Sequence, residues 1–184
     1  MEVYMKYASR DLMDEHEGIL HGLAILEKMA LLVASDSVDL KTDLAAMIDF
    51  LILFADKCHH GKEEGILFPA MEKYGIPKDG GPIGQMLIEH EKGREFIRGM
   101  SNAIATDEIK KESFLQNVHG YIDLLRAHIN KENTILFPMG DRAIPEAEQI
   151  TILEAFETHE RTVMGPGIHE KLHAMLDDFT TKYQ

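Results

Sequence analysis

The stretch His59-His60-Gly61-Lys62-Glu63-Glu64-Gly65-Ile66-Leu67-Phe68-Pro69 recurs 69 positions later as His128-Ile129-Asn130-Lys131-Glu132-Asn133-Thr134-Ile135-Leu136-Phe137-Pro138. In both copies a histidine precedes a glutamate by four positions. Residues four apart on a helix share one face, so His59 and Glu63 can reach one point together, as can His128 and Glu132. The repeat therefore predicts two equivalent halves of a single site.

Around this repeat, apolar residues return every three or four positions through almost the whole chain, which is the period of an amphipathic helix. The pattern predicts four long helices over about 9–35, 38–74, 82–106 and 114–140. Short links between long helices favour an all-α, antiparallel, up-and-down four-helix bundle. We expect a single domain over residues 1–184, with the bundle core at about 9–140 and one or two extra C-terminal helices at about 146–182.

Six polar side chains interrupt helix faces that are otherwise apolar: His16, His59, Glu63, His90, His128 and Glu132. Glu15-His16-Glu17 on the first helix resembles Glu89-His90-Glu91 on the third, so the odd-numbered helices repeat as well. Burying carboxylates without a partner costs several kcal/mol, by a rough figure. A bundle core that keeps two of them needs a cation, and the pattern predicts a metal site. His60 falls on a polar face with Asp56 and Glu64, and we expect it, like His21 and His119, to face solvent.

Composition narrows the classes of function. The chain has 184 residues and a formal net charge of -13, which disfavours nucleic acid and anionic membranes as partners. Its single cysteine, Cys58, excludes a disulfide framework and is expected to be a small buried residue beside the site. The apolar runs are too short to span a bilayer, and the first residues lack the apolar core of a signal peptide. We therefore expect a cytoplasmic protein.

Histidine together with carboxylates, without a thiolate, favours a dinuclear iron site, with manganese or a mixed pair as the alternative. The Glu-x-x-His pattern of ferritin-type bundles is absent, because no glutamate stands three residues before the four histidines. The pattern His…His-x3-Glu…His…His-x3-Glu instead resembles the hemerythrin-like, HHE cation-binding family over about residues 11–140. The resemblance implies a four-helix bundle with two iron ions joined by an oxo or hydroxo bridge, Glu63 and Glu132 as bridging carboxylates, and the four histidines as terminal ligands.

The sequence departs from the oxygen-carrying members of that family, which have a fifth histidine four residues after the one on the third helix. Here that position is Arg94. His159, which lies 69 residues after His90, is included as a seventh candidate ligand, with His169 and His173 as further alternatives. Fewer ligands favour reaction with, or sensing of, a small ligand such as O2, NO or peroxide. The alternatives are iron storage or delivery and reversible oxygen binding without turnover. Whether the chain is an enzyme is left open, no catalytic residue is assigned, and sensing would need a separate protein partner.

Overall fold

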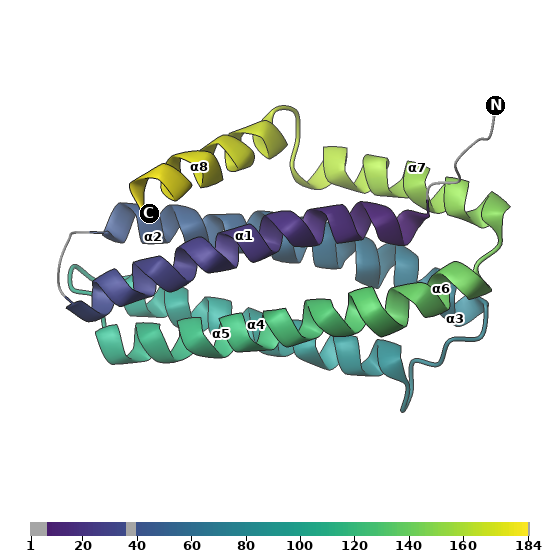
Figure 1. Cartoon of the computed structure of the whole chain (residues 1–184), viewed down its shortest axis with the longest axis horizontal. Coiled ribbons are helices and arrows are strands. Elements are labelled where there is room, and N and C mark those ends of the chain that lie inside the picture. Colours follow the sequence, from purple (N-terminus) through teal and green to yellow (C-terminus); the bar gives the residue numbers. More distant parts are fainter. Residues whose placement is uncertain (1–6, 36–39, 184) are drawn as a thin grey trace.

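The computed structural model describes residues 7–35 and 40–183, and every regular element within those ranges is helical (Figure 1). The elements are α1 (Ala8–Ser35), α2 (Lys41–Phe50), η1 (Leu51–His60), η2 (Glu63–Leu67), α3 (Phe68–Lys73), α4 (Pro82–Ile104), α5 (Lys111–Lys131), η3 (Glu132–Leu136), α6 (Phe137–Ala143), α7 (Glu146–Val163) and α8 (Ile168–Lys182), where η marks wider, π-helical turns. The prediction of an all-helical chain is confirmed. The start predicted for the second helix, Val38, lies outside the described residues.

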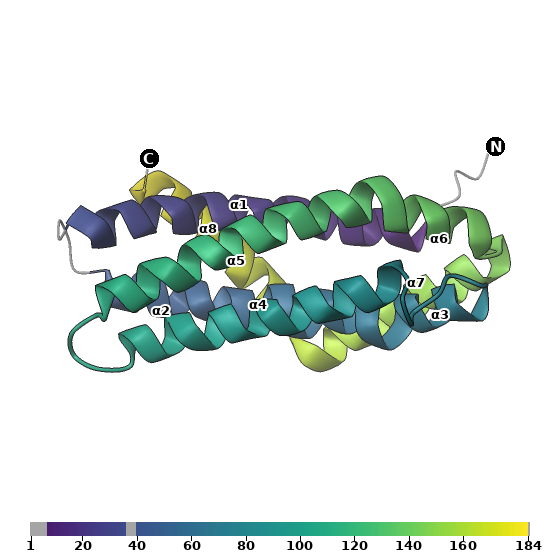
Figure 2. The ribbon, with the colours of Figure 1, turned by 90° about the horizontal axis from the view of Figure 1, so that it is seen from below.

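The long continuous runs of helix, which we call rods, lie side by side in a helical bundle (Figures 1 and 2). They are α1, the continuous run from α2 to α3, α4, and the continuous run from α5 to α6. The second rod ends just before Gly75, whose φ of 92° lies in the left-handed region that glycine adopts without a steric penalty. As a result the chain reverses direction at the point where the sequence predicted a break.

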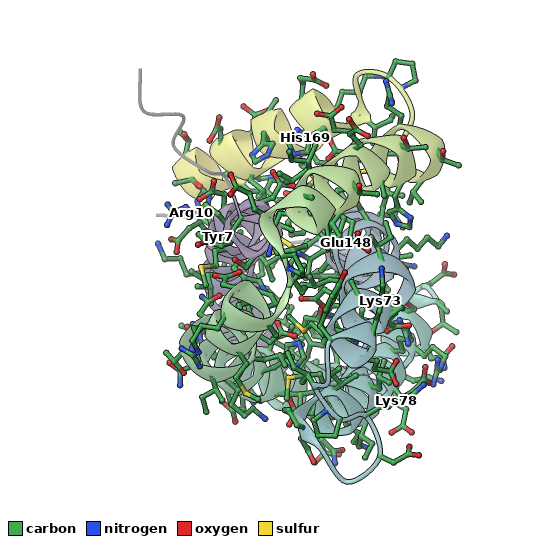
Figure 3. All side chains as sticks on the ribbon, turned by 90° about the vertical axis from the view of Figure 1, so that its right-hand side faces the viewer. Tyr7, Arg10, Lys73, Lys78, Glu148 and His169 are labelled. Carbon is green, nitrogen blue, oxygen red and sulfur yellow. The ribbon has the colours of Figure 1, made fainter. Side chains whose placement is uncertain are left out.

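The C-terminal helices α7 and α8 cover one side of the bundle, in contact with α1, and α7 also contacts η1 and η2 of the second rod (Figure 1). Figure 3 looks along the rods from one end and shows Lys73 of α3 beside Glu148 of α7, which form an ion pair. His169 of α8 appears in the same view on the outer layer of helices. The extra helices are thus joined to the bundle by polar contacts at its end as well as by packing.

The core consists of two apolar clusters with a polar layer between them. One cluster includes Ile19, Leu51, Ala55 and Leu125, and the other includes Leu12, Leu67, Phe68, Met86, Leu136 and Phe137. Along α1, His16 lies between Leu12 of one cluster and Ile19 of the other. In each of the other rods, one or two of the six predicted polar residues likewise stand between the residues of the two clusters. The polar layer is therefore enclosed at both ends by apolar side chains.

Helix α1 is long and apolar enough to cross a membrane by length and composition alone. In the structure one apolar face of this helix, with Leu12, Ile19, Leu23, Leu26 and Val33, is buried, whereas Leu31 is exposed. His16 is buried on the same face. The apolar character of α1 is therefore explained by its place in the bundle core.

The π-helical turns have an identifiable cause in two of three places. Pro69 and Pro138 have no backbone N–H, so the carbonyl groups four residues earlier lose their usual α-helical donor. Just before each proline the backbone N–H donates five residues back instead, from Phe68 to Glu63 and from Phe137 to Glu132. These wider turns, which often occur at functional sites, begin at the two glutamates of the repeat.

Candidate metal centre

The four rods bring the six predicted residues together at the polar layer. His16 comes from α1, His59 and Glu63 from the second rod, His90 from α4, and His128 and Glu132 from the fourth rod. Each of the six side chains is at most 1% exposed. The imidazoles form two pairs: Nε2 of His59 lies 2.9 Å from Nε2 of His16, and Nε2 of His90 lies 3.1 Å from Nε2 of His128.

The two glutamates join these pairs. Glu63 places Oε1 3.5 Å from Nε2 of His59 and Oε2 3.4 Å from Nε2 of His90. Glu132 places Oε2 3.3 Å from Nε2 of His16 and 3.2 Å from Nε2 of His128. Each carboxylate therefore contacts one histidine from each pair, which is the placement expected of a ligand shared by two neighbouring ions.

The donor set fits metal ions. Two ligand atoms at right angles on one ion, each about 2.1 Å from it, are about 3 Å apart, which is close to both Nε2–Nε2 distances. The four carboxylate oxygens of Glu63 and Glu132 are buried and have no hydrogen-bond partner among the described residues. Buried carboxylates are normally fully bonded, and a bound cation would supply what these oxygens lack.

The opposite nitrogen of each imidazole is held from outside the cluster. Nδ1 of His16 lies 2.7 Å from Oδ1 of Asn133, and Nδ1 of His59 lies 2.8 Å from Oε2 of Glu15. In the other pair, Nδ1 of His90 lies 2.7 Å from Oε1 of Glu64, and Nδ1 of His128 lies 2.9 Å from Oε2 of Glu89. Since these oxygens accept, each imidazole donates through Nδ1, which leaves Nε2 as the nitrogen that faces the cluster. This is the arrangement that orients histidine ligands at metal sites.

The outer partners follow the internal repeat. Glu15 and Glu89 stand one residue before His16 and His90, and each holds the histidine of the next rod. Lys62 and Lys131, each one residue before a glutamate of the cluster, pair in turn with Glu15 and Glu89. Sequence reasoning noticed the repeated Glu-His words but missed both lysines. Their equal positions in the two copies of the repeat were the signal that could have found them.

Charges within the cluster are strongly coupled. Burial acts to lower the pKa of His59, but the charge of Glu63 and the hydrogen bond to Glu15 outweigh it and raise the pKa to about 10. The pKa of His128 is likewise raised to about 10, against burial, by Glu132 and Glu89. Burial and Glu63 act to raise the pKa of Glu132, but His128 and His16 bring it to about 2. A cation that binds here replaces protons on the imidazoles, so its uptake releases protons.

One prediction about the histidines is wrong. His60 was expected to face solvent, but it is only 3% exposed, and its ring stacks on that of His90 with centroids 3.8 Å apart. The physical reason is the π-helical stretch η1, which ends at His60: the wider turn rotates the following residues away from the 3.6-residue pattern, so that adjacent His59 and His60 are both buried. Burial and the neighbouring His90 lower the pKa of His60 to about 3, which keeps its imidazole neutral.

The structure does not bring His159 to the cluster. Its Nε2 lies 3.0 Å from the carbonyl oxygen of Lys57, and its ring lies against Gly61 on the outer side of the second rod. On α8, Nε2 of His169 lies 3.2 Å from Nε2 of His173, and both rings pack on Phe54. The helical heights explain the result for His159, because it lies farther along α7 from the end of the bundle than Glu132 does along its own rod.

Arg94, the residue four positions after His90, has a structural role around the site. Its guanidinium donates to Asp56 at 2.7 Å and to Glu64 at 2.6 Å. Glu64 is the residue that holds His90, and Asp56 lies 3.5 Å from Nδ1 of His60. Cys58 is buried as predicted, and burial together with the charge of Glu15 raises the pKa of its thiol to about 12.

Four imidazoles and two carboxylates lie buried at one level of a helical bundle and are held from outside by three acids and an asparagine, an arrangement that could hold metal ions in a helical protein. The comparison with known families agrees with this class. Residues 8–140 match the profile of the hemerythrin HHE cation binding domain, and the chain belongs to that family.

The chain is also similar to several distant relatives. Uncharacterized proteins of Mycobacterium tuberculosis and Mycobacterium bovis are 25% identical over 163 residues, which cover 86% of this chain and 63% of theirs. The chain therefore spans less than two thirds of the length of these relatives. The iron-sulfur cluster repair protein YtfE of Salmonella schwarzengrund is 34% identical over 87 residues, 44% of this chain and 39% of that protein. No solved structure gives a significant match.

Proposed function

We propose that this chain is a di-iron protein, built on an antiparallel up-and-down four-helix bundle, that reacts with or senses a small ligand such as O2, NO or peroxide. The observation that carries the proposal is the position of Glu63 and Glu132, each of which contacts one histidine from each pair. Two ions would be held by His16 and His59 and by His90 and His128, with the glutamates between them. When bound, the iron supplies electron transfer and Lewis-acid activation of the small ligand.

The chain's own residues keep this site ordered and dry. Glu15, Glu64, Glu89 and Asn133 hold the Nδ1 sides of the imidazoles, so Nε2 stays available without a change of rotamer. The two apolar clusters on either side limit the entry of water. Nζ of Lys62 lies 2.5 Å from Oε1 of Glu15 and compensates the charge of this carboxylate, which also bonds to His59.

The pocket nearest to the cluster on the α4 side is where we propose that a small ligand approaches. Asp56 and Arg94 line a surface pocket of about 340 Å³ together with Ile52, Ile97, Arg98, Ser101 and Asn102. Asp56 is adjacent to His60, and Arg94 is adjacent to Glu64. The pocket therefore lies against the residues that surround the His90 half of the cluster.

The test starts from the anaerobic protein, loaded separately with ferrous iron and with manganese. We expect two iron ions per chain, and a preference for manganese would correct the metal assignment. The reduced protein is then exposed separately to oxygen, nitric oxide and peroxide while its optical spectrum is followed. Turnover or a specific spectral change supports the proposal, and a stable, fully reversible oxygenated form would instead indicate a carrier. The Glu63→Gln variant is the control, since it lacks the charge of one shared ligand while keeping the shape.

A second candidate is delivery of iron to another protein, favoured by the similarity to a protein named for iron-sulfur cluster repair. Delivery requires a site that releases its iron readily, whereas sensing requires a site that keeps its iron. Iron that transfers to a chelator on exposure to nitric oxide, without loss of helical structure, would favour this candidate. Iron that remains bound through repeated cycles would exclude it.

A further inference from the structure

His60 is a buried imidazole that neither the family pattern nor the hydrogen-bond network uses. It is 3% exposed, and neither of its ring nitrogens has a hydrogen-bond partner among the described residues. The nearest charged group is Asp56, whose Oδ1 lies 3.5 Å from Nδ1 of His60, beyond a good hydrogen bond. A buried polar ring with no partner costs free energy, and its retention requires an explanation.

Its surroundings are those of a ligand. One donor atom from each of His60, Glu63, His90 and His128 lies within 4.8 Å of all the others, and all four side chains are buried. The corresponding group in the other half of the site consists of His16, His59, Glu63 and Glu132. His60 therefore adds a third imidazole to the half that already contains His90 and His128.

The internal repeat shows that this imidazole breaks the symmetry of the site. The position equivalent to His60 in the second copy is Ile129, which is buried in an apolar cluster. The two rods thus place an imidazole beside one histidine pair and an isoleucine at the equivalent point of the other.

Asp56 stands on the Nδ1 side of His60, as Glu64 stands on the Nδ1 side of His90, and Arg94 donates to both carboxylates. This leaves Nε2 of His60 as the atom that can ligate. The ring is stacked on that of His90 with 13° between the planes, so ligation requires it to turn toward the cluster. Turning breaks no hydrogen bond, and it brings Asp56 into the orienting role that carboxylates have behind other histidine ligands.

We propose that His60 is a fifth imidazole ligand, bound to the ion that His90 and His128 hold. The proposal rests on the proposed di-iron function. It makes the two ions unequal, with three imidazoles on one side and two, from His16 and His59, on the other. More coordination positions then remain open on the His16 side.

The test uses His60→Ile, which installs the residue found at the equivalent position of the repeat, with His119→Ile on the exposed surface of α5 as matched control. Iron content, competition with a chelator and Mössbauer spectra are measured on the loaded proteins. We expect the unaltered protein and the control to bind two ions with two unequal signals. In His60→Ile one ion should be bound at least about ten-fold more weakly, by comparison with the effect of lost orienting groups, and its signal should change while the other persists.

Two unchanged signals and unchanged affinities in His60→Ile would overturn the proposal. If the unaltered protein binds fewer than two ions, the di-iron function itself has failed, which is a different result. Should His60→Ile not fold, X-ray absorption on the unaltered protein decides. Five imidazoles per iron pair support the fifth ligand, and four exclude it.

Discussion

Lys62 and Lys131 occupy equivalent positions of the repeat but differ in burial. The side chain of Lys62 is 1% exposed and lies 2.5 Å from Glu15 and 3.1 Å from Glu160, whereas that of Lys131 is 36% exposed and pairs with Glu89. An ion pair removed from water depends on both partners, because loss of one leaves the other charge buried. The two lysines therefore offer a matched pair of substitutions.

We expect Lys62→Met to lower the free energy of unfolding by about 3 kcal/mol, since it leaves Glu15 with only His59 as a partner in a buried setting. Lys131→Met should cost about 1 kcal/mol or less, because the charge of Lys131 is partly screened by solvent and Glu89 keeps its bonds to His128 and Gln85. Urea unfolding at pH 7 measures both. Equal losses in the two variants would contradict the interpretation that burial sets the difference.

At this scale the sequence was informative about six of the buried polar residues and misleading about a seventh. The helical face and the repeat both selected His59, Glu63, His128 and Glu132, and the structure brings these residues together with His16 and His90. His60 was missed because the argument assumed 3.6 residues per turn, which the π-helical stretch does not have. Nothing in the local sequence of η1 marks this, since its π-helical turns, unlike η2, do not end at a proline.

Among the elements, α7 is held to the second rod by a tight contact at Gly61. A β-carbon at Gly61 would lie 2.6 Å from Nε2 of His159, too close for the two to coexist without movement. His159 also bonds to the carbonyl oxygen of Lys57. We expect Gly61→Ala to lower the free energy of unfolding by about 1–3 kcal/mol, as overpacking does, despite the better helix propensity of alanine.

The double variant Gly61→Ala with His159→Ala should recover most of that loss, because the clash is then removed. His159→Ala alone should cost about 1 kcal/mol and should still bind two iron ions, since His159 lies outside the cluster. Thermal unfolding and iron content of all four proteins form a double-mutant cycle. Loss of one iron in His159→Ala would restore His159 as a ligand and contradict the geometry.

Helix α8 is tied to α2 by Asp43, which accepts from Lys182 Nζ at 2.5 Å and from the hydroxyl of Tyr183. Burial acts to raise the pKa of Asp43, but Lys182 and Tyr183 outweigh it and hold the pKa below its ordinary value. A lowered carboxyl pKa stabilises the folded state above the unfolded pKa of about 3.9, and the contribution is lost as pH falls through the folded pKa.

Asp43→Asn should therefore be less stable than the unaltered protein by up to about 1 kcal/mol at pH 7, a small value because the pair is partly exposed. The difference should shrink below about pH 4 as Asp43 takes up a proton in the unaltered protein. Urea unfolding from pH 7 downward measures the gap. A gap that widens in acid would mean that the tie is not the charge interaction described here.

The sequence predicted where helices begin and end more closely than it predicted which parts are α-helical and which are π-helical. The break after Tyr74 and the helices at 146–163 and 168–182 agree with the Gly- and Pro-rich positions that end a helix. The division of the second and fourth rods into α- and π-helical parts could not be read from periodicity, because both kinds of turn bury apolar residues at similar spacings. Pro69 and Pro138 stand at two of the π-helical turns. A proline alone does not predict such a turn, which is recognised only from the hydrogen bond that the preceding N–H makes to the carbonyl five residues back.

In the molecule as a whole, the two apolar clusters close around a layer whose charges balance only in part. Glu63 acts to raise the pKa of Glu132, which shows that the two carboxylates repel each other across the site. Bound cations would offset this repulsion and replace the protons on the imidazoles. Metal ions held here would contribute to the stability of the entire bundle, since the six predicted ligands come from all of the rods.

We expect the iron-loaded protein to melt well above the protein stripped with a chelator at pH 7. A ligand present at about a thousand times its dissociation constant adds about 4 kcal/mol. In a chain of this length 1 kcal/mol corresponds to roughly 2–4 °C, so the gap should be on the order of 10 °C.

The gap between the two melting temperatures should narrow as pH falls. The imidazoles of the cluster, among them His59 and His128 with pKa values raised to about 10, hold protons that metal must displace. A higher proton concentration therefore competes more strongly with the metal. Thermal unfolding by circular dichroism from pH 5 to pH 8 measures it, and a double variant of Glu63→Gln and Glu132→Gln, which removes both shared carboxylates, should show no gap at any pH. Equal melting temperatures of the loaded and stripped proteins at pH 7 would show that the polar layer is stable without metal.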